Sequence, residues 1–292
     1  MRSRTSALPG ALFILLLMPL TACSSAGHNG AGPPGSVLVA PVAHPGPEGV
    51  DQTLRLPLDA YFLSPADNAY LHRALDRLVE SCAARAGVRL PPRTPPAAKP
   101  ADRNARRYGL DDPEAAKARG YHPAEQPALA DEPLTADQLA TANACNTDAA
   151  RKITGGDDYP SDARVVRELN MRSYELSLAD PRVTSAVRAW SGCLRRAGYQ
   201  ANSPLDIENE FTATPSDRIS ARERELATAD VACKRRTGLT RTWNGVEREH
   251  QERLLNAEKA AVGEAVLERE TQLKRASEVL DEMGRVRPPT GR

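Results

Sequence analysis

Four cysteines, Cys82, Cys145, Cys193 and Cys233, are the side chains of this sequence with the clearest chemical role. No two of them stand at the Cys-x-x-Cys spacing of zinc and redox sites, and no histidine lies close to any of them. In a chain that is exported, as argued below, an even number of cysteines indicates disulfides. Four cysteines allow three connectivities.

The sequence around these cysteines occurs twice in the same order, which indicates an internal duplication. We therefore predict the pairs Cys82–Cys145 and Cys193–Cys233, each joining the first helix of one unit to its second helix. Each bridge would contribute about 4 kcal/mol in the chain-entropy model. The matching segments are residues 82–88 with 193–199, 139–145 with 226–233 (one residue inserted), and 151–155 with 234–238.

No motif for catalysis accompanies the cysteines. Gly-x-Ser-x-Gly, Ser-x-x-Lys and His-Glu-x-x-His are all absent, and the five histidines are scattered. Asp157-Asp158 and the alternating Asp206, Glu208 and Glu210 are placed in loops, but neither group has the ligand order of a calcium loop, so solvated acidic turns are expected. We assign no catalytic, cofactor-binding or metal-ligating residue. A hydrolase whose carboxylates meet only in the folded chain stays an alternative.

Helix signals supply the elements that would hold the cysteines in place. An N-capping residue followed by proline begins a helix at Ser64-Pro65 and at Asp180-Pro181, and Gly87 and Gly198 end these helices. The capping box Thr135 to Gln138 begins the partner helix of the first unit. Further helices are expected at 113–119, from about 161 to 178, from near Ser216, and from about 244 to 283.

The loop between the first two helices, residues 88–133, is long and rich in proline. Tyr108 and Tyr121 flank its one expected helix, 113–119. Loops of this length are commonly functional, so Tyr108 and Tyr121 are the candidate binding surface of the chain. The alternative is that this segment packs against the helices of the chain itself.

The expected C-terminal helix is the second candidate contact surface. At about 40 residues it would be roughly 60 Å long, which is more than the core could cover. Its near-heptad apolar positions, interrupted at Arg269, allow a coiled-coil contact with an envelope protein or a second copy. Packing on both units is the favoured alternative. The apolar positions are Leu255, Val262, Val266, Leu273, Ala276, Leu280 and Met283.

The N-terminal sequence is typical of an export signal. Arg2 and Arg4 precede an apolar run of about 14 residues, too short to span a bilayer but typical of a signal peptide. The run ends in Leu20-Thr21-Ala22-Cys23, which resembles the bacterial lipobox, so residues 1–22 are the predicted lipoprotein signal peptide and Cys23 the acylated residue. Residues 23–50 would form a flexible Gly/Pro-rich tether. The expected location is the extracytoplasmic face of the cell membrane, held there by lipid.

The amino-acid composition restricts the classes of partner that the chain is expected to bind. The formal charge is +1, and it falls to −1 when Arg2 and Arg4 leave with the signal peptide, so no long-range attraction to nucleic acid or to an anionic membrane is expected. Only 2 Trp, 7 Tyr and 3 Phe are present, too few for base-stacking platforms. Large apolar residues are also scarce, so the disulfides would compensate for a thin core.

The mature chain resembles a group of uncharacterised secreted lipoproteins of actinobacteria. Trp190-x-x-Cys193, the Arg-Ala-Gly-Tyr run ending at Tyr199, the run from Ala229 to Cys233, and the stretches around Tyr108 and Tyr121 carry this resemblance. Ser81 departs from it, because no Trp stands at the matching place in the first unit. These proteins have no assigned activity, so the resemblance implies location and fold alone.

The sequence thus predicts an all-α, disulfide-stapled helical bundle of two related units, residues 51–178 and 179–292, the second ending in a long amphipathic helix. The expected function is that of a non-enzymatic binding or adaptor protein of the cell envelope, with the hydrolase as the alternative. The expected partners are the membrane, through the N-terminal lipid, and an envelope protein, through the C-terminal helix.

Overall fold

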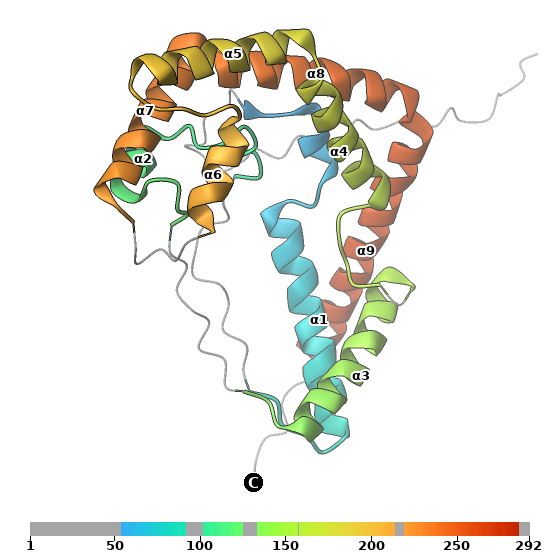
Figure 1. The fold of residues 1–292 in the computed structure, drawn as a ribbon. Coiled ribbons are helices and arrows are strands. Elements are labelled where there is room, and N and C mark those ends of the chain that lie inside the picture. Colours follow the sequence, from blue (N-terminus) through green and yellow to red (C-terminus); the bar gives the residue numbers. More distant parts are fainter. Residues whose placement is uncertain (1–53, 92–101, 125–132, 157, 214–218, 286–292) are drawn as a thin grey trace, which may run out of the picture. The chain divides into compact units, whose positions relative to one another are not determined.

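The computed structural model describes residues 54–91, 102–124, 133–156, 158–213 and 219–285. Within these ranges the chain is helical, so the all-α prediction is confirmed (Figure 1). No helix among them is long and apolar enough to cross a membrane. The predicted signal peptide, Cys23 and the tether lie outside the described residues. The elements are η2 (Pro57–Tyr61, a 3-10 helix), α1 (Pro65–Arg85), α2 (Pro113–Arg119), α3 (Ala136–Thr154), α4 (Arg164–Leu178), α5 (Pro181–Arg196), α6 (Pro204–Thr212), α7 (Ala221–Thr237), α8 (Leu239–Ala257) and α9 (Lys259–Arg285).

Side-chain caps fix where several helices begin. Ser64, Asp112 and Asp180 each accept a backbone N–H of the following turn, and a proline follows each of them at the first helical position. Thr135 and Gln138 form the predicted capping box of α3. Ser203-Pro204 has the same form and begins α6, so the prediction of a loop around Asp206 is wrong.

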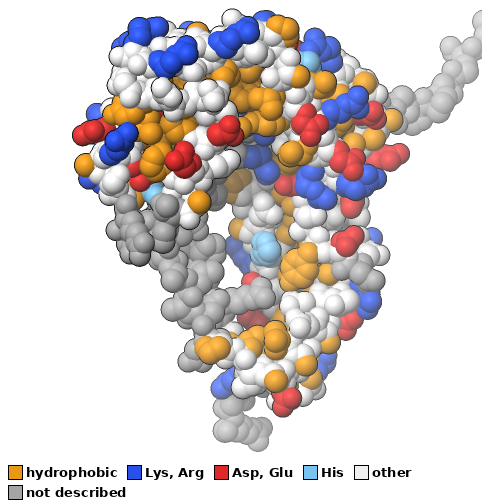
Figure 2. Space-filling model, viewed as in Figure 1, with side chains coloured by type: hydrophobic (Ala, Val, Ile, Leu, Met, Phe, Trp, Pro, Cys, Tyr) orange, Lys and Arg blue, Asp and Glu red, His pale blue; other side chains and the backbone are white. Residues whose placement is uncertain are grey.

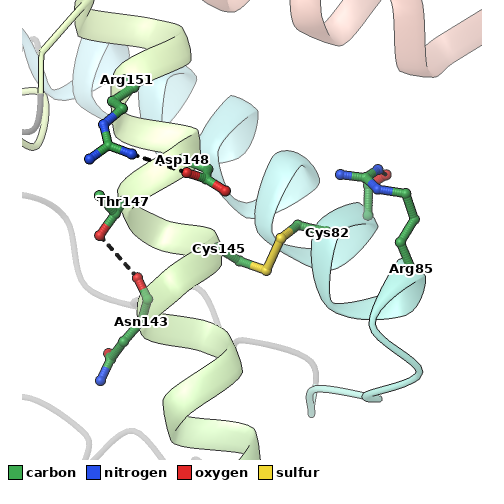
Figure 3. The surroundings of a disulfide bond; sticks show 8 residues. Cys82, Arg85, Asn143, Cys145, Thr147, Asp148 and Arg151 are labelled. Carbon is green, nitrogen blue, oxygen red and sulfur yellow. Dashed lines mark hydrogen bonds and ion pairs between the residues drawn. A yellow bond between two sulfur atoms is a disulfide. The ribbon is translucent and has the colours of Figure 1, made fainter.

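The first disulfide lies in a core made by α1, α3 and α9. Cys82 and Cys145 are bonded with a Cα–Cα distance of 5.7 Å, as predicted (Figure 3). Buried side chains of all three helices surround the bond, and the α9 residues Ala276 and Val279 are 0% and 1% exposed. We call this cluster the first core. Its other buried members are Leu63, Leu71, Ala74, Leu75, Val79, Ala83, Ala149 and Ile153.

The second disulfide, Cys193–Cys233, lies in a core made by α5, α7 and α8, with Tyr108 packed onto it. Its Cα–Cα distance is also 5.7 Å. Trp190 and Trp243 are its largest side chains, at 0% and 1% exposed. We call this cluster the second core. Both predicted pairings are therefore confirmed.

A third cluster joins the two cores. It combines Leu58 and Phe62 of the η2 region with residues of α4, the end of α8 and the start of α9. Through it, α4 packs against α8. In the first core, α9 packs against α1 and α3. α4 of the first predicted unit and α9 of the second therefore make their main contacts with elements of the other unit.

The predicted C-terminal helix from about 244 to 283 is two helices. α8 begins earlier, at Leu239, and the helical backbone is interrupted at Glu258, which has φ −106° and ψ 26°. Leu254 and Val262 lie on either side of this break, and both are buried in the third cluster. The interruption lets one continuous stretch of sequence contribute to both cores, since Trp243 belongs to the second and Val279 to the first.

Candidate functional site

The segment 102–124 docks against the chain's own helices. Tyr108 is 1% exposed and Tyr121 is 0% exposed, so neither side chain forms part of a binding surface, and that prediction is corrected here. The Tyr108 ring lies 5.3 Å from the Trp243 ring, and the Tyr121 ring stacks on Phe211 at 5.3 Å, measured between centroids. The alternative reading, packing within the chain, is confirmed.

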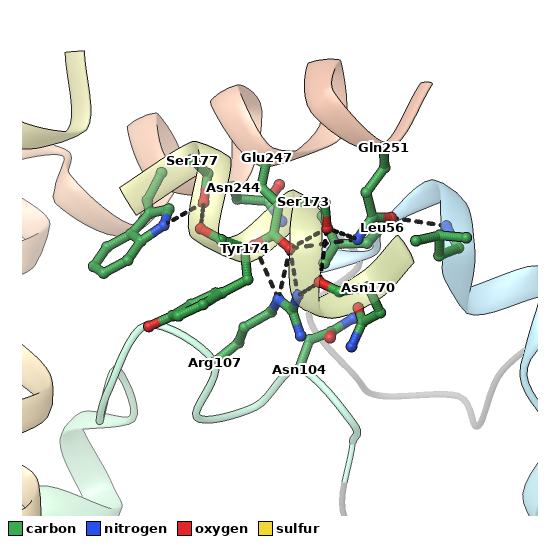
Figure 4. A network of polar contacts seen from close by, with 12 residues as sticks. Leu56, Asn104, Arg107, Asn170, Ser173, Tyr174, Ser177, Asn244, Glu247 and Gln251 are labelled. Atoms are coloured by element: carbon green, nitrogen blue, oxygen red, sulfur yellow. Dashed lines mark hydrogen bonds and ion pairs between the residues drawn. The ribbon is translucent and has the colours of Figure 1, made fainter. Parts of the chain in front are cut away.

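A carboxylate with no exposed surface, Glu247 of α8, lies at the centre of this docking site (Figure 4). Arg107 Nε lies 2.9 and 3.0 Å from its two oxygens, and Arg107 Nη2 makes a third contact. The Tyr108 hydroxyl donates to Glu247 Oε2 at 2.9 Å, and the Ser173 hydroxyl donates to Oε1 at 3.0 Å. We call these residues the Glu247 cluster.

The cluster extends to four elements of the fold. Gln251, one turn after Glu247, donates to Ser173 Oγ and accepts the backbone N–H of Leu58 at 2.8 Å. Arg107 Nη2 also donates to the carbonyl oxygen of Asn170 at 3.0 Å. The docked segment, η2, α4 and α8 are thereby held together by one hydrogen-bonded network.

A second buried ion pair lies inside α7, one turn from the second disulfide. Asp230 and Lys234 have fully buried side chains, with Lys234 Nζ 3.0 Å from Asp230 Oδ2. The Trp190 indole donates to Asp230 Oδ1 at 2.8 Å, and Lys234 also donates to the carbonyl oxygen of Leu110 at 2.7 Å. Gly109 is required here, because its φ is +83° and an added Cβ would lie 2.9 Å from Lys234 Nζ.

A third buried carboxylate, Glu223, holds the other end of the docked segment. It accepts the backbone N–H of Tyr121 at 3.0 Å, and His122 Nε2 lies 3.6 Å from the same oxygen. Gly120 makes room for it, since its φ is +57° and an added Cβ would lie 2.3 Å from Glu223 Oε1. The two glycines beside the tyrosines are therefore explained by close approach of charged side chains.

The burial of these groups shifts their pKa values. Burial raises the pKa of Tyr108 and, with Asp230 nearby, the pKa of Tyr121, so both phenols stay protonated, and the Tyr108 hydroxyl donates to Glu247. Burial also raises the pKa of Asp230, against the opposing effect of Lys234. Each of these shifts comes from enclosure within the chain.

What these groups can do chemically is limited by their surroundings. Glu247 is occupied by Arg107, Tyr108 and Ser173, and Asp230 by Trp190 and Lys234. A general base needs a substrate proton within reach of a free lone pair, and burial at 0% denies that approach. The arrangement fits a structural network that locks the segment 102–124 in place.

The acidic groups considered for metal binding do not gather. Among the described residues no group of three or more His, Cys, Asp or Glu side chains is placed to hold a metal ion. Glu208 on α6 instead pairs with Arg106 at 2.6 Å, and Arg106 also donates to the carbonyl oxygen of Tyr121. Asp157 lies outside the described residues.

A small hollow in the described part of the chain lies between the η2 region, the residues before α4, and α9. Its polar groups are already engaged: Asp162 Oδ1 accepts the backbone N–H of Leu63 at 2.7 Å, and Arg269 donates to the carbonyl oxygen of Ala60 at 3.2 Å. Arg269, which interrupts the apolar repeat, therefore has a role in joining α9 to the η2 region.

The apolar positions of the C-terminal helix pack inside the molecule. Val262 and Ala276 are buried, and Leu255, Leu273, Leu280 and Met283 pack against the first core or the third cluster. The favoured prediction, packing on the chain's own helices, accounts for these residues. The outer face of α9 carries Glu264, Leu267, Lys274 and Glu278, of which Leu267 is 64% exposed.

Sequence reasoning missed the buried charges Glu223, Asp230, Lys234 and Glu247 and the half-buried Arg107. One signal for two of them was present, because Asp230 and Lys234 stand on either side of Cys233 at i, i+4 spacing. Trp243, Glu247 and Gln251 also follow one another at intervals of four on the buried face of α8. Neither pattern says by itself that the charged side chain points inward.

Comparison with known proteins found no match: no family model, curated protein or solved structure is similar to this chain.

Proposed function

We propose that this chain is a lipid-anchored protein of the extracytoplasmic membrane face, acting there as a non-enzymatic binding or adaptor protein. The observation that carries the proposal is the pairing of all four downstream cysteines in two disulfides between helices. Structural disulfides persist in oxidising, extracytoplasmic compartments. Cys23 then remains as the cysteine at the end of a signal-like apolar run, where acylation would anchor the chain.

The buried network supports the non-enzymatic part of the proposal. The enclosed carboxylates Glu223, Asp230 and Glu247 each bind groups of the chain itself. They stabilise a docked segment and leave no lone pair facing an open site. The envelope-hydrolase alternative gains no support from any of the three.

The proposed protein-contact surface is the outer face of α9. Its inner face packs against α1, α3 and α4, so a partner would have to bind the side that carries Leu267. An exposed leucine flanked by Glu264, Glu268 and Lys274 suits a contact with a small apolar centre and a charged rim.

The anchor is tested by membrane fractionation of the full chain and a Cys23→Ser variant. Both fractions are washed in 1 M NaCl, which removes protein held only by charge. We expect the parent to stay with the membrane and the variant to be released. A parent that washes off, or a variant that remains, would reject the lipid anchor.

The adaptor role is tested by photo-crosslinking from position 267 in the full-length, anchored chain. A crosslinker at Leu139 of α3, which is 51% exposed, is the matched control. One envelope protein captured from position 267 and absent from position 139 is the expected result. The same products from both positions would reject the α9 surface. Ending the chain before α9 is less informative, because α9 completes the first core.

A further inference from the structure

The charges of the second unit are distributed unevenly. Residues 181–205 and 231–246 contain eight Lys or Arg residues and no Asp or Glu. Of the eight, Lys234 is buried, and Arg182 pairs with Asp180 and Glu249. The remaining six are all exposed, and none of them forms an ion pair with another described residue. They are Arg188, Arg195, Arg196, Arg235, Arg236 and Arg241, and we call them the arginine face.

The second disulfide brings four of these arginines together. Arg195 and Arg196 follow Cys193 by two and three residues, and Arg235 and Arg236 follow Cys233 by the same intervals. The Cα atoms of the two cysteines are 5.7 Å apart, so the last turns of α5 and α7 lie side by side. Lys and Arg side chains line the edge of the molecule over α5, and no acidic side chain lies beside them there (Figure 2).

The guanidinium groups lie over the helix surface. An added Cβ at Gly192 would be 3.8 Å from Arg195 Nη2 and also 3.8 Å from Arg196 Nη1. Both side chains therefore lie back along α5. Asp111 is one acidic group close enough to interact electrostatically with Lys234 and Arg235, although it forms no ion pair with Arg235.

The first unit does not share the excess of arginines that the matching segments of the second unit carry. Ala84 occupies the position that matches Arg195, whereas Arg85 matches Arg196. Near the first disulfide, Arg151 pairs with Asp148 at 3.3 Å (Figure 3). Lys152 pairs with Glu282 at 3.4 Å. Two basic side chains near the first disulfide are thus paired with acidic ones, whereas the four arginines beside the second disulfide form no ion pair with a described residue.

Favourable interaction with helix dipoles explains only part of the arginine face. Arginines in the last turns of α5 and α7 are stabilised by the partial negative charge there. Arg188, however, lies in the middle of α5, and Arg241 lies in the first turn of α8, where the dipole disfavours a cation.

We propose that the arginine face binds the phosphate groups of an anionic phospholipid surface. Guanidinium groups bind phosphate in a bidentate manner, and these six lie on exposed helix surfaces that a flat, charged layer can reach. The proposal rests on the proposed lipid anchor, which would hold the chain beside such a surface. Thirty residues separate Cys23 from Leu54 and span at most about 100 Å when extended, so their length does not prevent this face from reaching the membrane.

The test uses chain 23–292 with Cys23→Ser, which has no lipid, so that binding reports the arginine face alone. Sedimentation is measured with vesicles of zwitterionic phospholipid, with and without 30% anionic phospholipid, over a series of salt concentrations. We expect binding to the anionic vesicles alone, weakening as salt rises. Each arginine near the surface contributes about fivefold, so Arg195→Gln with Arg236→Gln should weaken binding by about 25-fold.

The matched control is Arg77→Gln with Arg85→Gln, which removes the same charge from exposed positions of α1 and should leave binding within about twofold. Circular dichroism of each variant verifies that the fold is retained. Equal binding to both kinds of vesicle, or equal losses in the two double variants, would overturn the proposal. The proposal would also be overturned if soluble polyphosphate or DNA displaced the protein from the vesicles at a phosphate concentration below that of the vesicles. The ligand would then be a soluble polyanion. Because this protein carries no lipid, the result is independent of the fractionation test at Cys23.

Discussion

Glu247 shows how a fully buried charge is accommodated in this protein. Its carboxylate is taken out of water, and the cost is offset by Arg107, the Tyr108 hydroxyl and the Ser173 hydroxyl. The Glu247 interaction also keeps the pKa of Arg107 above its ordinary value, although burial opposes it. Such a pair adds little over an apolar replacement of both partners, but it makes the loss of one partner costly.

Replacing Glu247 alone should therefore destabilise the protein strongly. Glu247→Gln leaves the half-buried Arg107 guanidinium without a charged partner, and we expect the free energy of unfolding to fall by about 3 kcal/mol. Urea unfolding followed by tryptophan fluorescence measures it, because Trp243 lies one turn away. Glu249→Gln is the control: Glu249 pairs with Arg182 at the exposed surface, so stability should change little. Similar losses in the two variants would show that Glu247 has no special role.

His250 should make stability depend on pH. Burial and the Arg253 guanidinium lower its pKa below 6.5, with Asp180 opposing, and Arg253 Nη2 lies 3.1 Å from His250 Nδ1. The unfolded chain then takes up a proton more readily than the folded chain, so stability decreases as pH falls through 6.5. Arg182 and Glu249 also face this imidazole.

The corresponding variant is His250→Gln, which cannot titrate. Melting temperatures at pH 7.5 and pH 5.5 should show a larger decrease for the parent than for the variant. Identical decreases would mean that the His250 pKa is the same in the folded and unfolded chains.

At the scale of elements, each disulfide joins two helices of one core. The bonds join residues 63 and 40 positions apart, and loss of either should cost about 4 kcal/mol in the chain-entropy model. For Cys82→Ala with Cys145→Ala this corresponds to a decrease of roughly 8–16 °C in melting temperature. Calorimetry of the variant and of the parent under reducing conditions measures the change. An unchanged melting temperature would show that α1 and α3 are held by packing alone.

Helix boundaries were predictable where a local signal marks them. Ser64-Pro65, Asp112-Pro113 and Asp180-Pro181 each place a capping side chain and a preset φ at a helix start. Ser203-Pro204 carries the same signal. The alternating acidic residues after it nevertheless led to the prediction of a loop there. The break at Glu258 has no such signal, because glutamate and lysine are good helix formers and packing of Leu254 and Val262 imposes it.

The buried charges were not predictable for a related reason. The cysteine pairs could be inferred because the repeat places them, and oxidation restricts their partners to each other. Glu247 and Arg107 are 140 residues apart, and no local pattern connects them. Only the docking of the segment 102–124 brings them together, so the role of Tyr108 as a buried donor also depends on tertiary structure.

At the scale of the whole molecule, two disulfide-bonded cores share no residue and are joined by the third cluster. The first core depends on α9, which comes last in the chain but packs against α1 and α3. The second core is completed by α8 and by the docked segment. This division predicts that the cores open as separate cooperative units.

Val279→Asp tests the division, because Val279 is 1% exposed in the first core. An aspartate there is buried without a partner, which costs several kcal/mol and is felt first by the helices that contact it. In hydrogen exchange we expect the amides of α1, α3 and the second half of α9 to lose protection, while those of α5, α7 and α8 keep theirs. Leu267→Asp, at a 64% exposed position of the same helix, should leave every element protected. Loss of protection throughout the chain in Val279→Asp would instead mean that the third cluster couples the two cores into one cooperative unit.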